Sequence, residues 1–243
     1  SDGKIVAVGF RSSYTSPNVI ALARYNPNGS LDSAFGFGGR VLTRIGSSSD
    51  QTAAFAAALQ SDGKIVVGGG WAHGSRALFA LVRYNPDGSL DSTFGKGGKV
   101  VTAIGSRYDV ISAISIQSDG KIVAVGRTLN GCCDDFALAR YMPSGALDTS
   151  FGTNGNVVTA FGPSDDEATA MAMQSAGNIV VAGYTTNSDQ SVYRFALARY
   201  TASGSLDPTF GTGGRVISAI GGSSETFAYG VALQSDGKIV AAG

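Results

Sequence analysis

The chain has 243 residues, of which 35 are glycine, and its 18 Lys and Arg balance its 18 Asp and Glu. The zero formal net charge provides no basic field for non-specific nucleic-acid binding, and no apolar stretch is long enough to span a bilayer. A charged fraction of only 15% with so many glycines is typical of short strands joined by tight turns, rather than of helices.

One internal repeat runs through the chain. The string SDGKIVAVG at 1–9 returns with small changes at 61–69, 118–126, 175–183 and 235–243. Arg-Tyr and Leu-Asp-x-x-Phe-Gly recur in the same order, so we expect a single repeat domain over 1–243 with a period of 57–60 residues. The expected units are approximately 1–60, 61–117, 118–174 and 175–234, with 235–243 starting a further unit. Because the sequence opens inside a turn motif without Met, we expect a segment of a longer protein.

Each unit contains four strand-like runs. In the second unit they are Ala53–Gln60, Lys64–Gly68, Leu78–Tyr84 and Lys99–Ile104. Every run is short and is bounded by Gly, Asp, Asn, Pro or Ser, which is the pattern of strands, and sequences such as Asn-Pro-Asp-Gly predict tight reversals. The sequence therefore predicts an all-β fold, a β-propeller of four-stranded antiparallel blades. A β-solenoid is the alternative, although its coils are usually shorter.

The repeat resembles a known family. The pattern Gln-Ser-Asp-Gly-Lys-Ile-Val-x-x-Gly, followed by Phe-Ala-Leu-Ala-Arg-Tyr-Asn-Pro-Asp-Gly-Ser-Leu-Asp-x-x-Phe-Gly, resembles the delta-60 repeat of bacterial β-propellers over essentially the whole chain. It is more distantly similar to NHL-type repeats. The resemblance implies a large secreted or surface-associated bacterial protein and no established catalytic residues. The NHL-like strand order places Ala53–Gln60 innermost, and the chain then begins after the inner strand of its first blade.

Charged pairs recur in every unit. An Arg and an Asp eight residues later flank the same turn: Arg24 and Asp32, Arg83 and Asp91, Arg140 and Asp148, Arg199 and Asp207. We expect these pairs to hold each blade's own hairpin, because an Arg fork can bind a carboxylate at two points. A ring of charged binding groups is the alternative. A residue that is present in every unit is expected to have a structural role within that unit.

Acidic residues also stand just before each expected inner strand. Asp50, Asp109, Asp166 and Glu225 are candidates for a cation or polar-ligand site at one mouth of the channel, with ordinary solvated loops as the alternative. The Asn-Pro-Asp-Gly-Ser-Leu-Asp segment also resembles a calcium loop. Two of the four copies lack the necessary oxygen ligands, so we expect a turn there and no resident cofactor or metal.

A few residues break the pattern of their units. Cys132 and Cys133 are adjacent in an expected loop, where a vicinal disulfide, a soft-metal site and a plain loop are all open. His73, the only histidine, is expected in the equivalent loop. The sequence has no Gly-x-Ser-x-Gly nucleophile elbow for which it could act as the base. Exposed aromatic residues in these loops suit ligand recognition, with simple loop packing as the alternative: Trp71, Tyr14, Tyr184 and Tyr193.

These observations favour a non-enzymatic binding, adhesion or scaffold module of a larger bacterial surface or secreted protein, with a protein or glycan as its ligand. One alternative is a propeller enzyme, a lyase or hydrolase with a site at the channel mouth. The other is a purely structural unit that associates with itself through edge strands. No nucleic acid and no membrane insertion are expected.

Overall fold

The computed structural model describes residues 2–13, 15–222 and 224–243, and within these ranges the chain forms strands and no helix. The first sheet comprises β1 (Ile5–Ser13), β2 (Ser16–Tyr25) and β3 (Arg40–Thr43). The second comprises β4 (Gln51–Leu59), β5 (Ile65–His73), β6 (Arg76–Tyr84) and β7 (Lys99–Thr102). The third comprises β8 (Arg107–Ile116), β9 (Ile122–Asn130), β10 (Cys133–Tyr141) and β11 (Asn156–Thr159). The fourth comprises β12 (Asp166–Met173), β13 (Ile179–Thr186), β14 (Tyr193–Tyr200) and β15 (Arg215–Ser218), and the last pairs β16 (Gly230–Leu233) with β17 (Ile239–Ala242).

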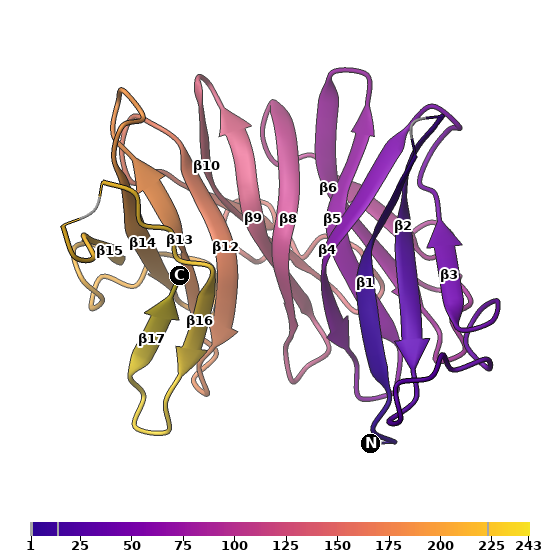
Figure 1. The fold of residues 1–243 in the computed structure, drawn as a ribbon. Helices are drawn as coiled ribbons and strands as arrows, with labels where there is room; N and C mark the ends of the chain where they lie inside the picture. Colours follow the sequence, from indigo (N-terminus) through magenta and orange to yellow (C-terminus); the bar gives the residue numbers. More distant parts are fainter. Residues whose placement is uncertain (1, 14, 223) are drawn as a thin grey trace.

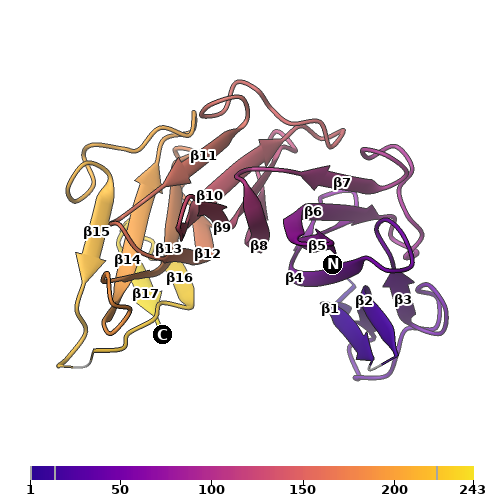
Figure 2. The ribbon, with the colours of Figure 1, turned by 90° about the horizontal axis from the view of Figure 1, so that it is seen from above.

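The sheets are blades of a β-propeller. Every neighbouring pair of strands within them is antiparallel and consecutive in the chain, which confirms the predicted four-stranded blade and excludes the β-solenoid. The blades stand side by side (Figure 1), and seen from above they form an arc that is open on one side (Figure 2). The strands β4, β8, β12 and β16 line its concave side, as expected for the inner strands, while β3, β7, β11 and β15 lie on the convex side (Figure 2).

The second and third strands are longer than predicted. The run Lys64–Gly68 was expected to end at its glycines, but β5 continues to His73 and β6 already begins at Arg76. The prediction was wrong because Gly69 is not a strand end. It lies opposite a β-bulge of the inner strand, where an added Cβ would stand 1.9 Å from the carbonyl oxygen of Ala53.

The same bulge occurs in each complete blade and explains the final glycine of the repeated string. The register shifts lie between Ala54 and Ala56, Ile111 and Ala113, and Ala168 and Ala170. The glycine opposite has no room for a side chain in any of them, because a Cβ would meet the carbonyl oxygen of the bulge at 1.9 Å: Gly69, Gly126 and Gly183. Local backbone geometry, and not a ligand, therefore requires this residue.

The hydrophobic core lies between blades. Each junction buries apolar side chains from both sheets, and a tyrosine on the third strand of one blade reaches the preceding blade. Its hydroxyl donates a hydrogen bond to a threonine at the end of that blade's outer strand: Tyr84 to Thr43 at 2.8 Å, Tyr141 to Thr102 at 2.9 Å and Tyr200 to Thr159 at 2.9 Å. Burying one large apolar side chain contributes roughly 1.5–3 kcal/mol, so each junction is a substantial source of stability.

Candidate functional site

The recurring Arg and Asp residues meet in every unit. Arg Nε lies 2.6 to 2.9 Å from Asp Oδ2, and the arginine carbon Cζ stacks 4.5 to 4.8 Å from the centre of a phenylalanine ring. The four sets are Arg24, Asp32 and Phe35; Arg83, Asp91 and Phe94; Arg140, Asp148 and Phe151; Arg199, Asp207 and Phe210. The guanidinium is thus held by a carboxylate and an aromatic face of its own blade.

The same arginine also connects neighbouring blades, which the sequence spacing did not indicate. Nη1 of Arg83 donates to the carbonyl oxygen of Pro143 in the next blade at 2.5 Å, and Arg140 reaches Ala202 in the same way at 2.5 Å. The Arg83 and Arg140 side chains are only 6% and 8% exposed. Their donors therefore face protein acceptors and not the channel.

Lysine side chains add to these pairs. The Lys4 ammonium lies 2.8 Å from Asp32 and contributes most among the donors that lower the pKa of this carboxyl to about 2. Burial raises the pKa of Asp91, but hydrogen bonds from Thr93 and Lys64, with the charge of Arg83, outweigh it and leave the pKa well below its ordinary value. Both carboxylates are therefore charged at neutral pH.

Three of the four acids named before the inner strands do not lie in solvated loops. Asp50, Asp109 and Asp166 are buried, at 3%, 0% and 0% exposure, and each accepts hydrogen bonds from the backbone of the loop before it. The donors are Ser47 N at 2.7 Å, Ile104 N at 2.7 Å and Phe161 N at 2.6 Å, in the same order. The expectation of solvated loops was wrong here because three tight loops need an internal acceptor for their N–H groups.

The four candidate acids do not occupy one equivalent position. The bulge register makes Asp109 equivalent to Asp166, whereas Asp50 lies two residues earlier in its unit and Glu225 one residue earlier. Glu225 is exposed, unlike the other three. Among the described residues, no group of three or more His, Cys, Asp or Glu side chains is arranged to hold a metal ion. The geometry thus gives these acids separate roles within their blades.

One of the buried acids, Asp166, has a raised pKa. Asp166 Oδ1 has no hydrogen-bond partner, whereas the corresponding oxygen of Asp109 accepts from Thr128 Oγ1 at 2.5 Å. Burial, partly offset by the hydrogen bond from Phe161 N, raises the pKa of Asp166 to about 6. This carboxyl therefore titrates in the mildly acidic range.

His73, one of the pattern-breaking residues, lies on a strand. His73 ends β5, its Nδ1 is 2.7 Å from Asp50 Oδ1, and its ring stacks on Trp71 at 5.7 Å between ring centres. Trp71 Nε1 donates to the same carboxylate at 3.2 Å. The hydrogen bond with His73 is the largest of several interactions that lower the pKa of Asp50 to about 2. The expected loop is absent because Gly74, with a φ of 59°, permits a two-residue reversal into β6.

The two cysteines lie in an equivalent hairpin of the third blade. Cys132 and Cys133 are joined as a vicinal disulfide, and Cys133 is the first residue of β10. The expected loop is again only a reversal between extended strands, through Gly131 with a φ of 72°. Tyr14, another aromatic residue named from the sequence, lies outside the described residues.

The turn that resembles a calcium loop is closed by its own side chains. Asp87 Oδ1 accepts from Ser89 N at 2.9 Å and from Ser89 Oγ at 2.7 Å. Asn85 Nδ2 donates to the same serine hydroxyl at 2.9 Å. The oxygens that would serve as cation ligands are thus engaged in an Asx-type turn.

A second set of residues converges from three blades, and only part of it was identified from the sequence. Arg127 of β9 reaches the following blade, where Nη1 lies 2.6 Å from Glu167 Oε2. The Tyr184 hydroxyl donates to the same oxygen at 2.7 Å. Burial, and to a lesser extent the contact with Glu167, raises the pKa of this phenol. Arg127 also pairs with Asp134 at 3.4 Å.

Aromatic rings extend this set toward the last blade. Tyr184 meets Phe227 edge-on at 5.0 Å, and Tyr193 lies 4.8 Å from the same ring. Phe227 is stacked on Tyr229 at 6.0 Å with an interplanar angle of 17°, and Tyr229 is 65% exposed. Tyr184 and Tyr193 were expected in loops but lie on β13 and at the start of β14. We call this set the Tyr184 cluster: Arg127, Glu167, Tyr184, Tyr193, Phe227 and Tyr229.

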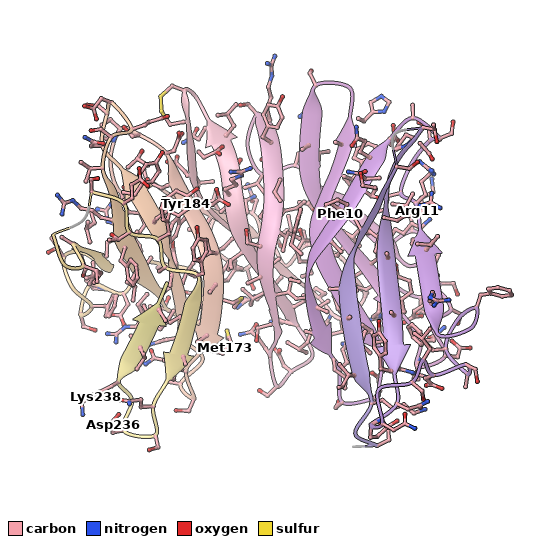
Figure 3. The ribbon with its side chains drawn as sticks, in the orientation of Figure 1. Phe10, Arg11, Met173, Tyr184, Asp236 and Lys238 are labelled. Carbon is pink, nitrogen blue, oxygen red and sulfur yellow. A yellow bond between two sulfur atoms is a disulfide. The ribbon has the colours of Figure 1, made fainter. Side chains whose placement is uncertain are left out.

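The Tyr184 cluster occupies positions that vary between units. The residues equivalent to Tyr184 are Phe10, Gly70 and Arg127, and those equivalent to Glu167 are Ala53, Val110 and Phe227. Tyr184 and Phe10 stand at opposite ends of the arc (Figure 3). Aligning the units position by position, and asking where chemistry changes, is the signal that could have found Arg127 and Phe227 from the sequence.

The family comparison agrees with this architecture. Residues 1–35, 60–94, 117–151 and 174–210 match the model of a family described as a domain of unknown function (DUF5122) beta-propeller. No curated protein matches the chain. A solved structure named "Glycoside hydrolase" is similar at 12% identity and a TM-score of 0.44, over 99% of this chain and 60% of that chain. The chain thus spans about three-fifths of that protein's length, and a likeness this weak supports no conclusion about activity.

Among the described residues, no helix is both long and apolar enough to cross a membrane. The four segments that match the family model together cover more than half of the chain, one in each repeat. They include the Arg-Tyr strand and end at the phenylalanine that stacks on the arginine of the same blade. The chain belongs to the DUF5122 beta-propeller family.

Proposed function

We propose that the protein is a non-enzymatic binding module whose Tyr184 cluster receives a glycan. The supporting observation is the exposed ring of Tyr229, stacked on Phe227. Phe227 in turn meets Tyr184, whose hydroxyl is bonded to the carboxylate that Arg127 also holds. Flat aromatic faces pack against the apolar faces of sugar rings, while carboxylate and guanidinium groups bind hydroxyls. A rigid blade scaffold fixes these groups before the ligand arrives, which lowers the entropy cost of binding.

A binding role fits this set better than catalysis. Glu167 Oε2 already accepts hydrogen bonds from Arg127 and Tyr184, and Arg127 is shared with Asp134. The only histidine belongs to the second blade, where it is paired with Asp50. The groups that could serve as nucleophile or base, the Glu167 carboxylate and the Tyr184 hydroxyl, are therefore already bonded to each other, and Glu167 is also paired with Arg127.

The resemblance to delta-60 repeats supports placing the module in a larger bacterial protein at the cell surface or outside the cell. The vicinal disulfide supports the same location, because disulfides persist in oxidising compartments. In this proposal the module needs no cofactor, and the ligand is a surface or environmental polysaccharide.

Titration calorimetry with a panel of defined oligosaccharides tests the proposal. We expect at least one to bind, and Tyr229→Ala to weaken binding by about tenfold, corresponding to about 1.4 kcal/mol. The matched control is Tyr108→Ala, which removes a tyrosine that is 50% exposed on β8 and outside the cluster. Binding that is unchanged by Tyr229→Ala, or equally weakened by Tyr108→Ala, would contradict the assignment.

A further inference from the structure

The Tyr184 cluster adjoins five carboxyls at the start of two strands in neighbouring blades. They are Asp134 and Asp135 of β10, Asp165 in the loop before β12, and Asp166 and Glu167 of β12, and we call them the acidic group. The two segments meet there, because the Asp134 N–H donates to Asp165 Oδ1 at 2.9 Å. Both blades have a neighbouring sheet on either side, so the acidic group lies within the arc and not at one of its ends (Figure 2).

The guanidinium of Arg127 is shared by two of these carboxyls. Its Nη1 lies 2.6 Å from Glu167 Oε2 and 3.4 Å from Asp134 Oδ2. Burial raises the pKa of Asp134 and the charge of Arg127 lowers it, but the charges of the neighbouring carboxyls raise it further. The negative charge around Asp134 is therefore larger than the positive charge that Arg127 supplies.

The other carboxyls of the acidic group are bonded to uncharged groups or have a free oxygen. Asp165 Oδ2 accepts from Gln190 Nε2 at 2.7 Å, and Asp135 Oδ2 accepts from Asn130 Nδ2 at 2.9 Å. Asp166 Oδ1 is buried and has no hydrogen-bond partner within the described ranges. Burial, and to a lesser extent the charge of Asp135, raises the pKa of Asp166. A cation near this group would stabilise charges that the protein leaves uncompensated.

The acidic group and the aromatic rings of the Tyr184 cluster meet at Glu167. The Tyr184 hydroxyl donates to Glu167 Oε2, and the ring of Tyr184 meets Phe227 at 5.0 Å between ring centres. The exposed ring of Tyr229 follows at 6.0 Å from Phe227. One end of the site is thus acidic and the other aromatic. A ligand that touches both ends spans several ring widths, which fits an oligosaccharide better than a single sugar.

We infer that the glycan proposed above is an amine-bearing one, a chain of 2-amino-2-deoxy sugars whose amino groups are protonated. The inference rests on the proposed function and names the ligand class of the same site. One sugar face packs on Tyr229, while an ammonium group on a neighbouring sugar donates hydrogen bonds to the carboxylates of Asp134 and Glu167. Both side chains are within reach, being 21% and 23% exposed.

The charge of the acidic group discriminates between classes of glycan. An acidic glycan brings a carboxylate or sulfate against like charges, which opposes binding. An N-acetylated glycan has the same sugar backbone but no positive charge, so it keeps the contact with the aromatic rings and loses the attraction to the carboxylates. The amine-bearing form alone of these three satisfies both ends of the site.

A matched pair of ligands tests the inference by titration calorimetry at about pH 6, where carboxyls of ordinary pKa are ionised. One ligand is a β-1,4-linked pentasaccharide of glucosamine, and the other is its fully N-acetylated form. We expect the amine form to bind at least about tenfold more tightly. Raising the NaCl concentration from about 0.05 to 0.5 M should weaken binding of the amine form and leave the acetylated form unchanged, because salt screens exposed charges.

A charge-removing variant provides the second measurement. Asp134→Asn keeps the shape of the side chain and is expected to weaken binding of the amine form at least about threefold, with no effect on the acetylated form. The matched control is Asp119→Asn, which removes the same charge from a side chain that is 54% exposed in the turn at the opposite end of the same blade. An unchanged near-ultraviolet spectrum shows that both variants are folded.

Failure of the ligand class and failure of the proposed function give different results. If the acetylated form or an acidic oligosaccharide binds as tightly as the amine form, the ligand class is overturned while a glycan site remains. The same holds if Asp119→Asn weakens binding as much as Asp134→Asn does. If no oligosaccharide of any class binds, the proposed function and the inference are both overturned.

Discussion

Removing one carboxylate from the second blade tests whether the Arg–Asp pairs hold the fold. Asp91 accepts hydrogen bonds from Arg83 Nε at 2.8 Å and from Thr93 N and Oγ1 at 3.0 and 2.6 Å, and it lies 3.3 Å from Lys64. Asp91→Ala leaves the guanidinium of Arg83 buried against Phe94 without its anion. Breaking a buried pair in this way costs about 3–5 kcal/mol.

The fourth blade provides an internal comparison. Asp207 and Arg199 are 11% and 20% exposed, and Arg199 Nη1 has no acceptor among the described residues. Asn178 replaces the lysine of the other units. Asp207→Ala is therefore expected to cost only about 1–2 kcal/mol, the sum of a partly exposed ion pair and the bonds of its turn.

Thermal unfolding followed by circular dichroism measures the difference. With about 2–4 °C for each kcal/mol in a domain of this size, Asp91→Ala should lower the midpoint by roughly 6–20 °C and Asp207→Ala by roughly 2–8 °C. Urea titration of both variants gives the free energies of unfolding independently. Equal losses in the two variants, or a loss below about 1 kcal/mol for Asp91→Ala, would refute the burial argument.

Two further predictions concern the inner strands. Gly126→Ala is expected to lower the free energy of unfolding, measured by urea titration, by more than about 3 kcal/mol, because a Cβ 1.9 Å from the Val110 carbonyl oxygen forces the bulge to open. The control is Gly162→Ala: a Cβ there meets nothing within 4 Å, so the change should be less than about 0.5 kcal/mol. Asp166→Asn is expected to remove a pH dependence of stability between about pH 4 and 6, measured by urea titrations across this range, because the pKa of Asp166 is raised to about 6.

The direction of the Asp166 effect follows from proton linkage. Between the ordinary pKa of 3.8 and about 6, the folded protein binds the proton and the unfolded chain does not, so stability falls as the pH rises through this interval. A shift of this size corresponds to at most about 3 kcal/mol. The opposite slope comes from Asp32, whose lowered pKa of about 2 makes stability fall only below pH 4. A wild-type protein whose stability is flat from pH 4 to 6 would contradict the raised pKa of Asp166.

The repeated positions made the fold predictable from the sequence. Strand identity, turn position and the meeting of Arg83 with Asp91 all follow from short-range patterns that return at a fixed period. Strand ends were harder, because Gly69 resembles a terminator but is required by the bulge opposite it. The burial of Asp109 was also not predicted. Asp109 accepts hydrogen bonds from loop backbone N–H groups, and every loop sequence carries such groups.

The Tyr184 cluster was less accessible to sequence reasoning because its members come from three blades. Arg127 and Glu167 are 40 residues apart, and Phe227 lies in yet another unit. Such contacts follow from the arrangement of blades in space and not from any local pattern. Two variable positions could have drawn attention to it: the one that Tyr184 shares with Arg127 and the one that Glu167 shares with Phe227.

Constant and variable positions have different tasks in this repeat. A constant residue such as Arg83 satisfies two interactions at once, one with Asp91 in its own blade and one with Pro143 in the next. Because every junction uses the same groups, the constant residues can recognise only another blade of the same kind. A ligand that differs from a blade must be recognised by variable residues, and the Tyr184 cluster is where charged and aromatic variable residues converge. The fold and the proposed glycan site therefore rest on separate residues, so that Asp91→Ala should lower stability, while Tyr229→Ala should weaken glycan binding.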